Sequence, residues 1–381
     1  MRDIMTLFRS LKPIIVKEFR QIRRDPTSLG MLLVLPAALI VLVGYALNFD
    51  VKHISLAIFD QDKTSSSRAY LEKFKHTDLF VYRFDVRSYR DVEELFMSGR
   101  AKIAIVVPEQ FAEDLLAGRD THIQILVDGS DANSAAQAIN NAARITADYS
   151  TRLITDGFQR MGKEYYVPVD FQPRVWYNPD LVSNQFLLPG LIGFILVLTS
   201  VISTSMTVVR EKERGTMEQI MVSPLRPIDV ILGKTIPYML ISLLAATAIL
   251  VIGFVLFGIQ VRGSLLLLYA GIVVIILGAL GQGLLISTVT DSQQVAFMVS
   301  VFSSLLPSFL LSGFMFPISS MPVVLQLLSN VAVTKFFLVV VRAVMLKGVG
   351  FSAVWEQFLY MFIFAAIMLG VSTRRMQKRT L

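Results

Sequence analysis

The residues best suited to recognition by charge lie in one short stretch, Met206–Lys234, which links the end of one apolar run to the start of another. A short helix that carries both signs of charge can bind in a partner's groove, because opposite charges set register and orientation. The alternative is a solvated loop with local ion pairs, such as Glu211 with Arg214. The residues before Pro224 and Pro227 are conformationally restricted, which would fix the angle to the following run. The charged residues of the stretch are Arg210, Glu211, Lys212, Glu213, Arg214, Glu218, Arg226, Asp229 and Lys234.

Small polar residues inside the apolar runs form a second group. Serines recur every four residues in one run, which gives a polar stripe on a helix, and Pro307 adds a predicted kink there. Such stripes could line the path of a weakly polar or amphipathic substrate, or they could serve close helix packing, which small residues favour in membranes. The same two readings apply to a row of small residues at Ala279, Gly283 and Ser287. The predicted path consists of Ser200, Thr204, Ser300, Ser304, Ser308 and Ser312.

No motif of enzymatic or cofactor chemistry occurs in the chain. It has no cysteine, no GxxxxGK[ST] phosphate loop, no HExxH and no GxSxG. The histidines His53, His76 and His122 lack the spacing of metal ligands. Asp128 and Asp131 could form an acidic site, although a loop with a helix N-cap is the favoured interpretation. We therefore predict a protein that is not an enzyme and holds no catalytic residue, cofactor or metal.

The composition is that of a membrane protein. Of 381 residues, 54% are hydrophobic and 17% are charged, whereas a soluble domain carries about 25% charged residues. The net charge of +7 comes from basic residues beside apolar runs, which the positive-inside rule explains without any nucleic-acid partner. Lys234 lies about one turn inside the edge of an apolar run, where its side chain is expected to snorkel to water.

Six apolar runs have the length of about 20 residues that a membrane-spanning helix needs. The residues before and after them, 1–27 and 372–381, are rich in Lys and Arg, so both termini are predicted to be cytoplasmic. An even number of spans satisfies that requirement, with residues 210–229 inside the cell and 49–185 outside. The six predicted spans are Ser28–Asn48, Phe186–Val209, Val230–Phe257, Leu265–Val289, Val295–Phe316 and Ser352–Val371.

Two further segments are expected at the membrane surfaces. Residues 1–27 form an amphipathic elbow helix that lies on the inner surface. A seventh apolar region, Val323–Met345, holds Lys335 and Arg342. A full span there would move the basic tail outside, so the region 317–351 is predicted to hold re-entrant or interfacial helices on the outer side.

The long segment between the first two spans is predicted to be a small α/β domain. Strands are expected at His53–Phe59, Phe80–Val86, Lys102–Val107 and His122–Val127. Helices are expected at Ser65–Lys75, Tyr89–Met97 and Pro108–Ala117, followed by a long helix over Asp131–Met161. The alternation of strands and helices predicts a largely parallel sheet.

Three motifs resemble those of ABC transporter permeases of the type-2 export class. The stretch "VVREKERGTMEQIMVSPL" resembles the family signature, in which the segment after the second span is the coupling helix. The stretch "LLSGFMFPISSMPVVLQLLSN" resembles the region after the fifth span with its re-entrant outer helices. The motif "WYNPD" resembles the subgroup with a large external domain between the first two spans. Val331 departs from the family pattern, which has proline there.

The resemblance implies a permease subunit of an ATP-driven exporter in the bacterial inner membrane. Two permeases, identical or related, would pair with two ABC ATPase subunits that bind the ATP, and the coupling helix 210–229 would bind in a groove of the ATPase. Membrane lipid and a periplasmic adaptor are further expected partners. The substrate class expected from the uncharged spans is amphipathic, drug-like or lipid-like. The ATPase-coupling residues implied are Arg210, Glu211, Lys212, Glu213, Arg214, Gly215, Thr216 and Glu218.

Two other functions remain open on the sequence. The chain could be a membrane-anchored assembly or sensor protein whose external domain binds a partner. A self-sufficient secondary transporter is disfavoured, because such proteins need ionisable residues near the middle of the membrane.

Overall fold

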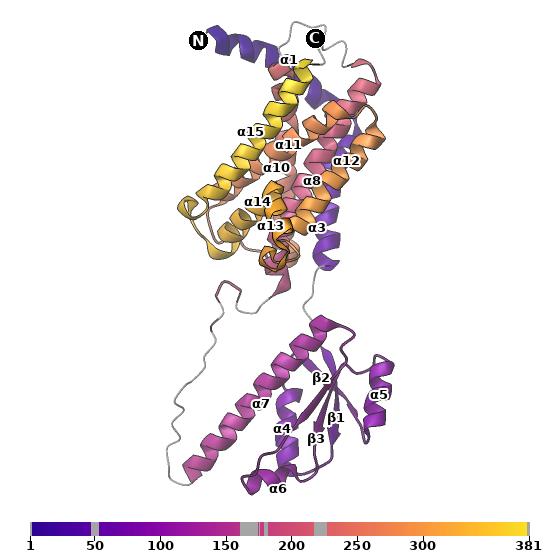
Figure 1. Ribbon diagram of the computed structural model, residues 1–381, viewed down its shortest axis with the longest axis vertical. Helices are drawn as coiled ribbons and strands as arrows, with labels where there is room; N and C mark the ends of the chain where they lie inside the picture. The colour runs from indigo at the N-terminus through magenta and orange to yellow at the C-terminus, as the bar shows by residue number, and fades with distance from the viewer. Residues whose placement is uncertain are drawn as a thin grey trace. The chain divides into compact units, whose positions relative to one another are not determined.

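The computed structural model describes residues 2–46, 53–160, 174, 176–178, 182–216 and 227–378. The chain forms two compact units (Figure 1). A helical unit comprises Met1–Asn48 and Val175–Leu381, and a second unit comprises Phe49–Arg174. Each unit has its own buried core, so each is described by itself.

The second unit is a four-stranded sheet covered by helices on both faces. Its strand order is β2-β1-β3-β4, with β1 parallel to β2 and β3, and with β4 antiparallel to β3. The prediction of a largely parallel sheet is therefore confirmed. The strands are β1 (Ile54–Asp60), β2 (Phe80–Asp85), β3 (Ile103–Val107) and β4 (Gln124–Val127).

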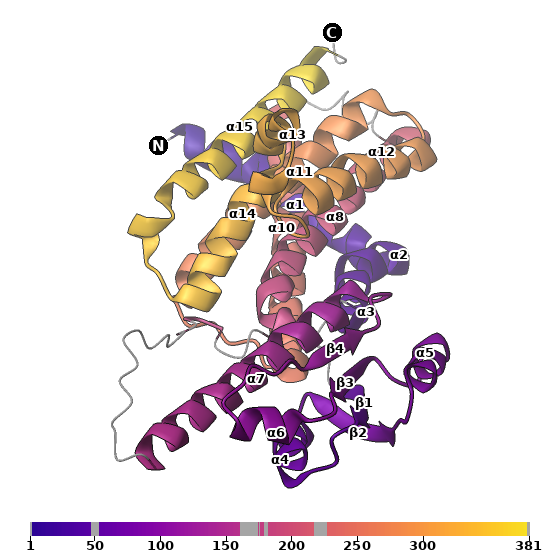
Figure 2. The ribbon, with the colours of Figure 1, turned by 60° about the horizontal axis from the view of Figure 1, so that its bottom comes forward.

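The helices of this unit divide between the two faces of the sheet. In Figures 1 and 2, α5 lies on one side, and α4, α6 and α7 lie on the other. Asp131 accepts hydrogen bonds from the backbone N–H groups of Asn133 and Ser134 at the start of α7, which confirms the favoured N-cap interpretation. The helices are α4 (Ser65–Lys75), α5 (Tyr89–Met97), α6 (Phe111–Leu116) and α7 (Ala132–Arg160).

The helical unit holds five long apolar helices among the described residues, and each overlaps one of the last five predicted spans, although the fifth predicted span extends beyond its helix, to Phe316. They cover Ser183–Glu213, Asp229–Phe257, Leu265–Val289, Gln293–Leu311 and Trp355–Met376. The first predicted span contains an apolar helix of only 17 residues, Gly30–Ala46, and residues 47 and 48 at its end lie outside the described residues. Its crossing of the membrane stays a prediction.

The outer region expected to re-enter the membrane is a bent helix pair. Val323–Val331 and Val333–Lys347 meet at an angle of 84°, so this part of the chain is not one straight span. Among the described residues, the α-helices of the helical unit are α1 (Arg2–Arg24), α2 (Pro26–Leu29), α3 (Leu35–Ala46), α8 (Ser183–Glu213), α10 (Pro227–Phe257), α11 (Leu265–Val289), α12 (Gln293–Leu306), α13 (Val323–Leu328), α14 (Val333–Arg342) and α15 (Trp355–Lys378).

The core of the helical unit is built around α8, most of whose residues are buried. Close packing of α11 on α8 depends on Gly283, where a Cβ atom would lie 2.7 Å from the carbonyl oxygen of Val201. A larger side chain there would force the helices apart. At this position the small-residue row of the fourth predicted span serves helix packing.

Candidate functional site

The charged end of α8 is the part of the chain where the predicted coupling residues lie. The helix runs without a break through Glu213 and ends because Gly215 adopts φ = +66°, a left-handed conformation that glycine tolerates. Residues Arg210–Glu213 are therefore the last turn of α8. The expected separate short helix does not begin at Arg210, and residues 217–226, which include Glu218, lie outside the described residues.

Successive residues on a helix point about 100° apart, so the four residues Arg210–Glu213 face four different directions. Glu211 faces α1 and α10. Its carboxylate pairs with Lys17 and Lys234, and Glu18 pairs with the same two lysines at 3.1 Å and 3.0 Å. Two lysines and two glutamates thus form one cluster without net charge, which we call the buried quartet.

Burial makes the balance of charge in the quartet essential. The side chains of Glu18, Lys234 and Glu211 are only 0%, 2% and 4% exposed, while Lys17 is 43% exposed. Partial burial lowers the pKa of Lys17, but the neighbouring carboxylates of Glu18 and Glu211 favour its charged form. The net result is a pKa above the ordinary value for lysine. Lys234 does not extend to water as the sequence suggested. Glu18 and Glu211 keep the Lys234 side chain buried, and no local sequence pattern revealed this pairing.

The other three residues of this turn contact different elements. Arg210 pairs with Asp25, between α1 and α2, and its Nε donates to the Gln293 side chain at 3.0 Å. Lys212 donates to the carbonyl oxygens of Ser287 and Thr290, the latter at 3.1 Å. Lys212 thus places positive charge where α11 ends and its dipole is negative.

Glu213 completes the set at the start of α12. Its carboxylate accepts the backbone N–H of Gln293 at 2.7 Å, which places negative charge at a helix N-terminus. Four consecutive side chains therefore connect the end of α8 to α1, α10, α11 and α12. We call Arg210–Glu213 with these contacts the α8 hub.

The hub changes the interpretation of the predicted coupling residues. Arg210, Glu211, Lys212 and Glu213 contact neighbouring helices, although Glu213 is exposed. Arg214, Gly215 and Thr216 are also exposed, and Thr216 donates a hydrogen bond to the carbonyl oxygen of Glu211 at 3.1 Å. Sequence reasoning missed Glu18 and Lys17, which lie on an amphipathic helix 193 and 194 residues before Glu211 and give no local signal.

The elbow helix α1 is held against α10 by shape as well as by charge. Gly233 leaves room for the side chain of Ile14, because a Cβ atom at Gly233 would lie 2.5 Å from Ile14 Cγ2. The next residue of α10 is Lys234, whose Nζ is 3.0 Å from Glu18 Oε1. Packing and ion pairing therefore fix α1 at the same point.

The predicted polar path is divided by the fold. Ser200 bonds to Ser242 at 3.2 Å and Ser300 bonds to Ser205 at 2.6 Å, so both connect neighbouring helices. Ser312 bonds back to the carbonyl oxygen of Ser308. The hydroxyl of Thr204 is buried and has no hydrogen-bond partner among the described residues. These four residues do not line the cavity described next.

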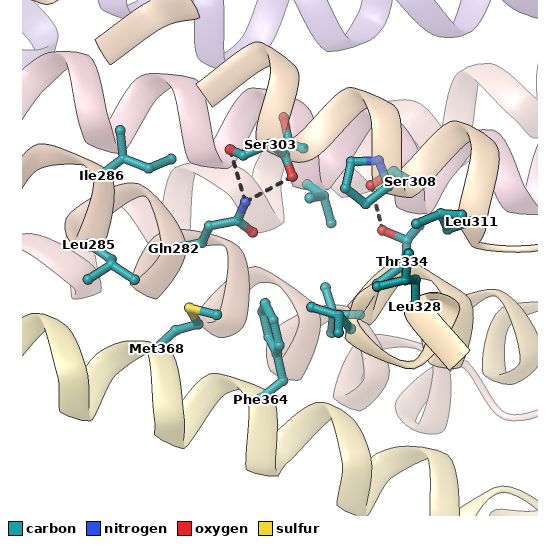
Figure 3. Close-up of a pocket in the computed structure, with 16 residues that line it drawn as sticks. Gln282, Leu285, Ile286, Ser303, Ser308, Leu311, Leu328, Thr334, Phe364 and Met368 are labelled. Carbon is teal, nitrogen blue, oxygen red and sulfur yellow. Dashed lines mark hydrogen bonds between the residues drawn. The ribbon is translucent and has the colours of Figure 1, made fainter. Parts of the chain in front are cut away.

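Ser304 and Ser308 line a cavity of about 430 Å³ between α11, α12, α14 and α15 (Figure 3). Its walls are mostly apolar, and Ser308 bonds there to Thr334 at 2.6 Å. Gln282 also lines it and donates from Nε2 to the carbonyl and hydroxyl oxygens of Ser303, at 3.2 Å and 3.3 Å. Gln282 is not among the path residues predicted from the sequence, although an amide inside an apolar run was a visible signal.

The comparisons with known proteins agree with one another. A family model described as "ABC-2 family transporter protein" matches residues 26–374. The probable multidrug ABC transporter permease YbhR of Escherichia coli (strain K12) is 30% identical over 350 residues, 92% of this chain and 93% of that one.

Two further relatives come from the same organism. The probable multidrug ABC transporter permease YbhS is 32% identical over 345 residues, 90% of this chain and 89% of that one. The inner membrane transport permease YhhJ is 26% identical over 329 residues, 85% of each chain. With a family model that covers nearly the whole chain and full-length relatives that are permeases, this multi-pass membrane protein belongs to the ABC-2 family of transporters.

Proposed function

We propose that the chain is the permease subunit of an ATP-driven exporter that moves an amphipathic, drug-like or lipid-like substrate. ATP would be bound and hydrolysed by separate ABC ATPase subunits, and a second permease, identical or related, would complete the pore. The α8 hub is the observation that carries this proposal, because it joins the end of one helix to four others. The two relatives described as probable multidrug permeases support the substrate class.

The hub provides a way to pass motion from a partner into the helices. Exposed residues Arg214 and Thr216 would contact the ATPase, and the engaged residues Arg210–Glu213 would transmit its movement. A push on the end of α8 then reaches α10 through Lys234 and α12 through Glu213. Charged contacts suit this role since they fix orientation more than they add affinity.

The orientation in the membrane follows from charge. The hub, α1 and the C-terminal end of α15, with Arg374 and Arg375, lie at one end of the helical unit (Figure 1). Basic residues flank spans on the cytoplasmic side, so this end would face the cytoplasm. The unit Phe49–Arg174 would then lie on the outer side of the bacterial inner membrane.

The cavity of Figure 3 would accept part of the substrate. Its apolar walls suit a hydrophobic body, while Gln282, Ser303 and Thr334 offer a few neutral hydrogen-bonding groups. We expect Gln282→Leu to change the KM for an amphipathic dye several-fold without changing basal ATPase activity. Ser200→Ala, at a position outside the cavity, is the matched control and should leave the KM unchanged.

The coupling proposal is tested with the permease–ATPase complex in vesicles. Glu213→Gln should keep the ATPase subunit bound but lose substrate-stimulated hydrolysis, because the contact with the start of α12 weakens. Arg214→Glu should instead lose co-purification of the ATPase subunit. The opposite pattern would contradict the division between engaged and exposed residues. Absence of ATP-dependent transport by the wild-type complex would favour the assembly or sensor alternative.

A further inference from the structure

A second cavity, of about 640 Å³, lies between α1 and the end of α8. Its volume is within the range of about 300–1,000 Å³ that is typical of ligand sites. Lys17, Arg20 and Arg24 recur at positions that share one face of α1, and α8 adds two more cations from the other side. The five cations of the lining are Lys17, Arg20, Arg24, Arg210 and Arg214.

The cavity holds more positive than negative charge. Its two lining acids are Asp25, which pairs with Arg210, and Glu211, which pairs with Lys17. Arg20, Arg24 and Arg214 form no ion pair with any acidic residue in the part of the chain that the structure describes. The cavity therefore has three guanidinium groups that can bind an anion. Each presents a planar, forked set of N–H donors, which matches the geometry of phosphate oxygens.

The surroundings of the cavity indicate where the anion comes from. On α1, Val16 and Phe19 alternate with the basic residues and are 38% and 37% exposed. An amphipathic helix with this arrangement places its apolar residues among lipid chains and its basic residues at the level of the headgroups. A phospholipid whose phosphate is bound by Arg20 and Arg24 would thus have its acyl chains beside Val16 and Phe19.

We propose that this cavity binds the phosphate group of an anionic phospholipid. The site is separate from the substrate cavity. It adjoins the α8 hub, because Arg210 and Glu211 belong to both, and its lining includes Arg214 and Thr216, which the proposed function places at the ATPase. A bound headgroup would connect α1 to the end of α8 and would neutralise the surplus cations. Basic pockets on the cytoplasmic side of membrane proteins are suited to such headgroups.

The test uses the purified full chain in nanodiscs of mixed phosphatidylglycerol and phosphatidylcholine, with retained lipid measured by native mass spectrometry. The variant R20Q/R24Q removes two cations that line the cavity. K12Q/R23Q removes two exposed cations from the same helix outside the cavity, so it has the same net charge. We expect R20Q/R24Q to retain phosphatidylglycerol about 30-fold less tightly and K12Q/R23Q to match the wild type.

Three further arms decide the source of the anion. R20K/R24K keeps the charge but loses the planar guanidinium groups, so it should lose less lipid retention than R20Q/R24Q. It also controls for misfolding of the glutamine variant. Equal losses in R20Q/R24Q and K12Q/R23Q would overturn the proposal, as would displacement of the lipid by millimolar inorganic phosphate. Normal lipid retention by R20Q/R24Q with loss of the ATPase subunit would assign the cavity to an acidic partner surface instead.

Discussion

At the scale of single residues, the buried quartet shows how charge is kept inside this protein. Each lysine contacts both glutamates, so no member relies on a single partner. Isolated charges in such a place would be strongly unfavourable, but a group of paired opposite charges is tolerated. The quartet is therefore sensitive to any change that alters its net charge.

Removing one charge from the quartet should destabilise the protein. Lys234→Met leaves two buried glutamates with one lysine, and we expect a loss of about 3–5 kcal/mol in the free energy of unfolding. Thermal unfolding in detergent measures it. The exposed Lys12→Met is the control and should change little. Adding Glu211→Leu to Lys234→Met should recover much of the loss, and no recovery would argue against charge balance as the cause.

At the scale of elements, the joint between α1 and α10 depends on the absence of a side chain. Gly233→Val places a branched side chain where Ile14 now lies, and overpacking of this kind costs about 1–3 kcal/mol. We expect α1 to detach, measured as faster proteolysis near Arg24. Ile14→Ala in the same chain should restore protection by making room. If the double variant is cleaved as fast as Gly233→Val, the contact is not what holds α1.

Local patterns predicted the elements better than the contacts between them. Strands such as Ile103–Val107 and helices such as Tyr89–Met97 follow from short-range apolar periodicity and caps. The pairing of Glu18 with Lys234 spans 216 residues and leaves no trace in either segment. Ser304 and Ser308 belong to a stripe that the sequence shows, but the cavity they line also needs residues of α11, α14 and α15, which the stripe does not predict.

At the scale of the whole molecule, the sheet unit should fold without the helical unit. Buried residues cover both faces of its sheet, for example Phe74 on one and Val92 on the other. We expect a soluble fragment of residues 53–160 to show cooperative thermal unfolding by circular dichroism. A fragment that aggregates or unfolds gradually would show that the unit requires the rest of the chain.

The prediction that both termini lie on one side of the membrane is also testable. The chain has no cysteine, so a single cysteine can be labelled without background. We expect Lys378→Cys in intact cells to resist a membrane-impermeant maleimide and His122→Cys to react. Labelling of Lys378→Cys from outside would contradict an even number of spans.

The long sequence separation within the buried quartet has a consequence for biogenesis. Glu18 and Lys17 leave the ribosome about 200 residues before Glu211 and Lys234 do. Synthesis proceeds at about 5–20 residues per second, so α1 is made roughly 10–40 s before the residues that bury its charges. During that interval Glu18 must remain hydrated at the membrane surface. Synthesis of α10, which carries Lys234, is thus the event that can close α1 onto the rest of the protein.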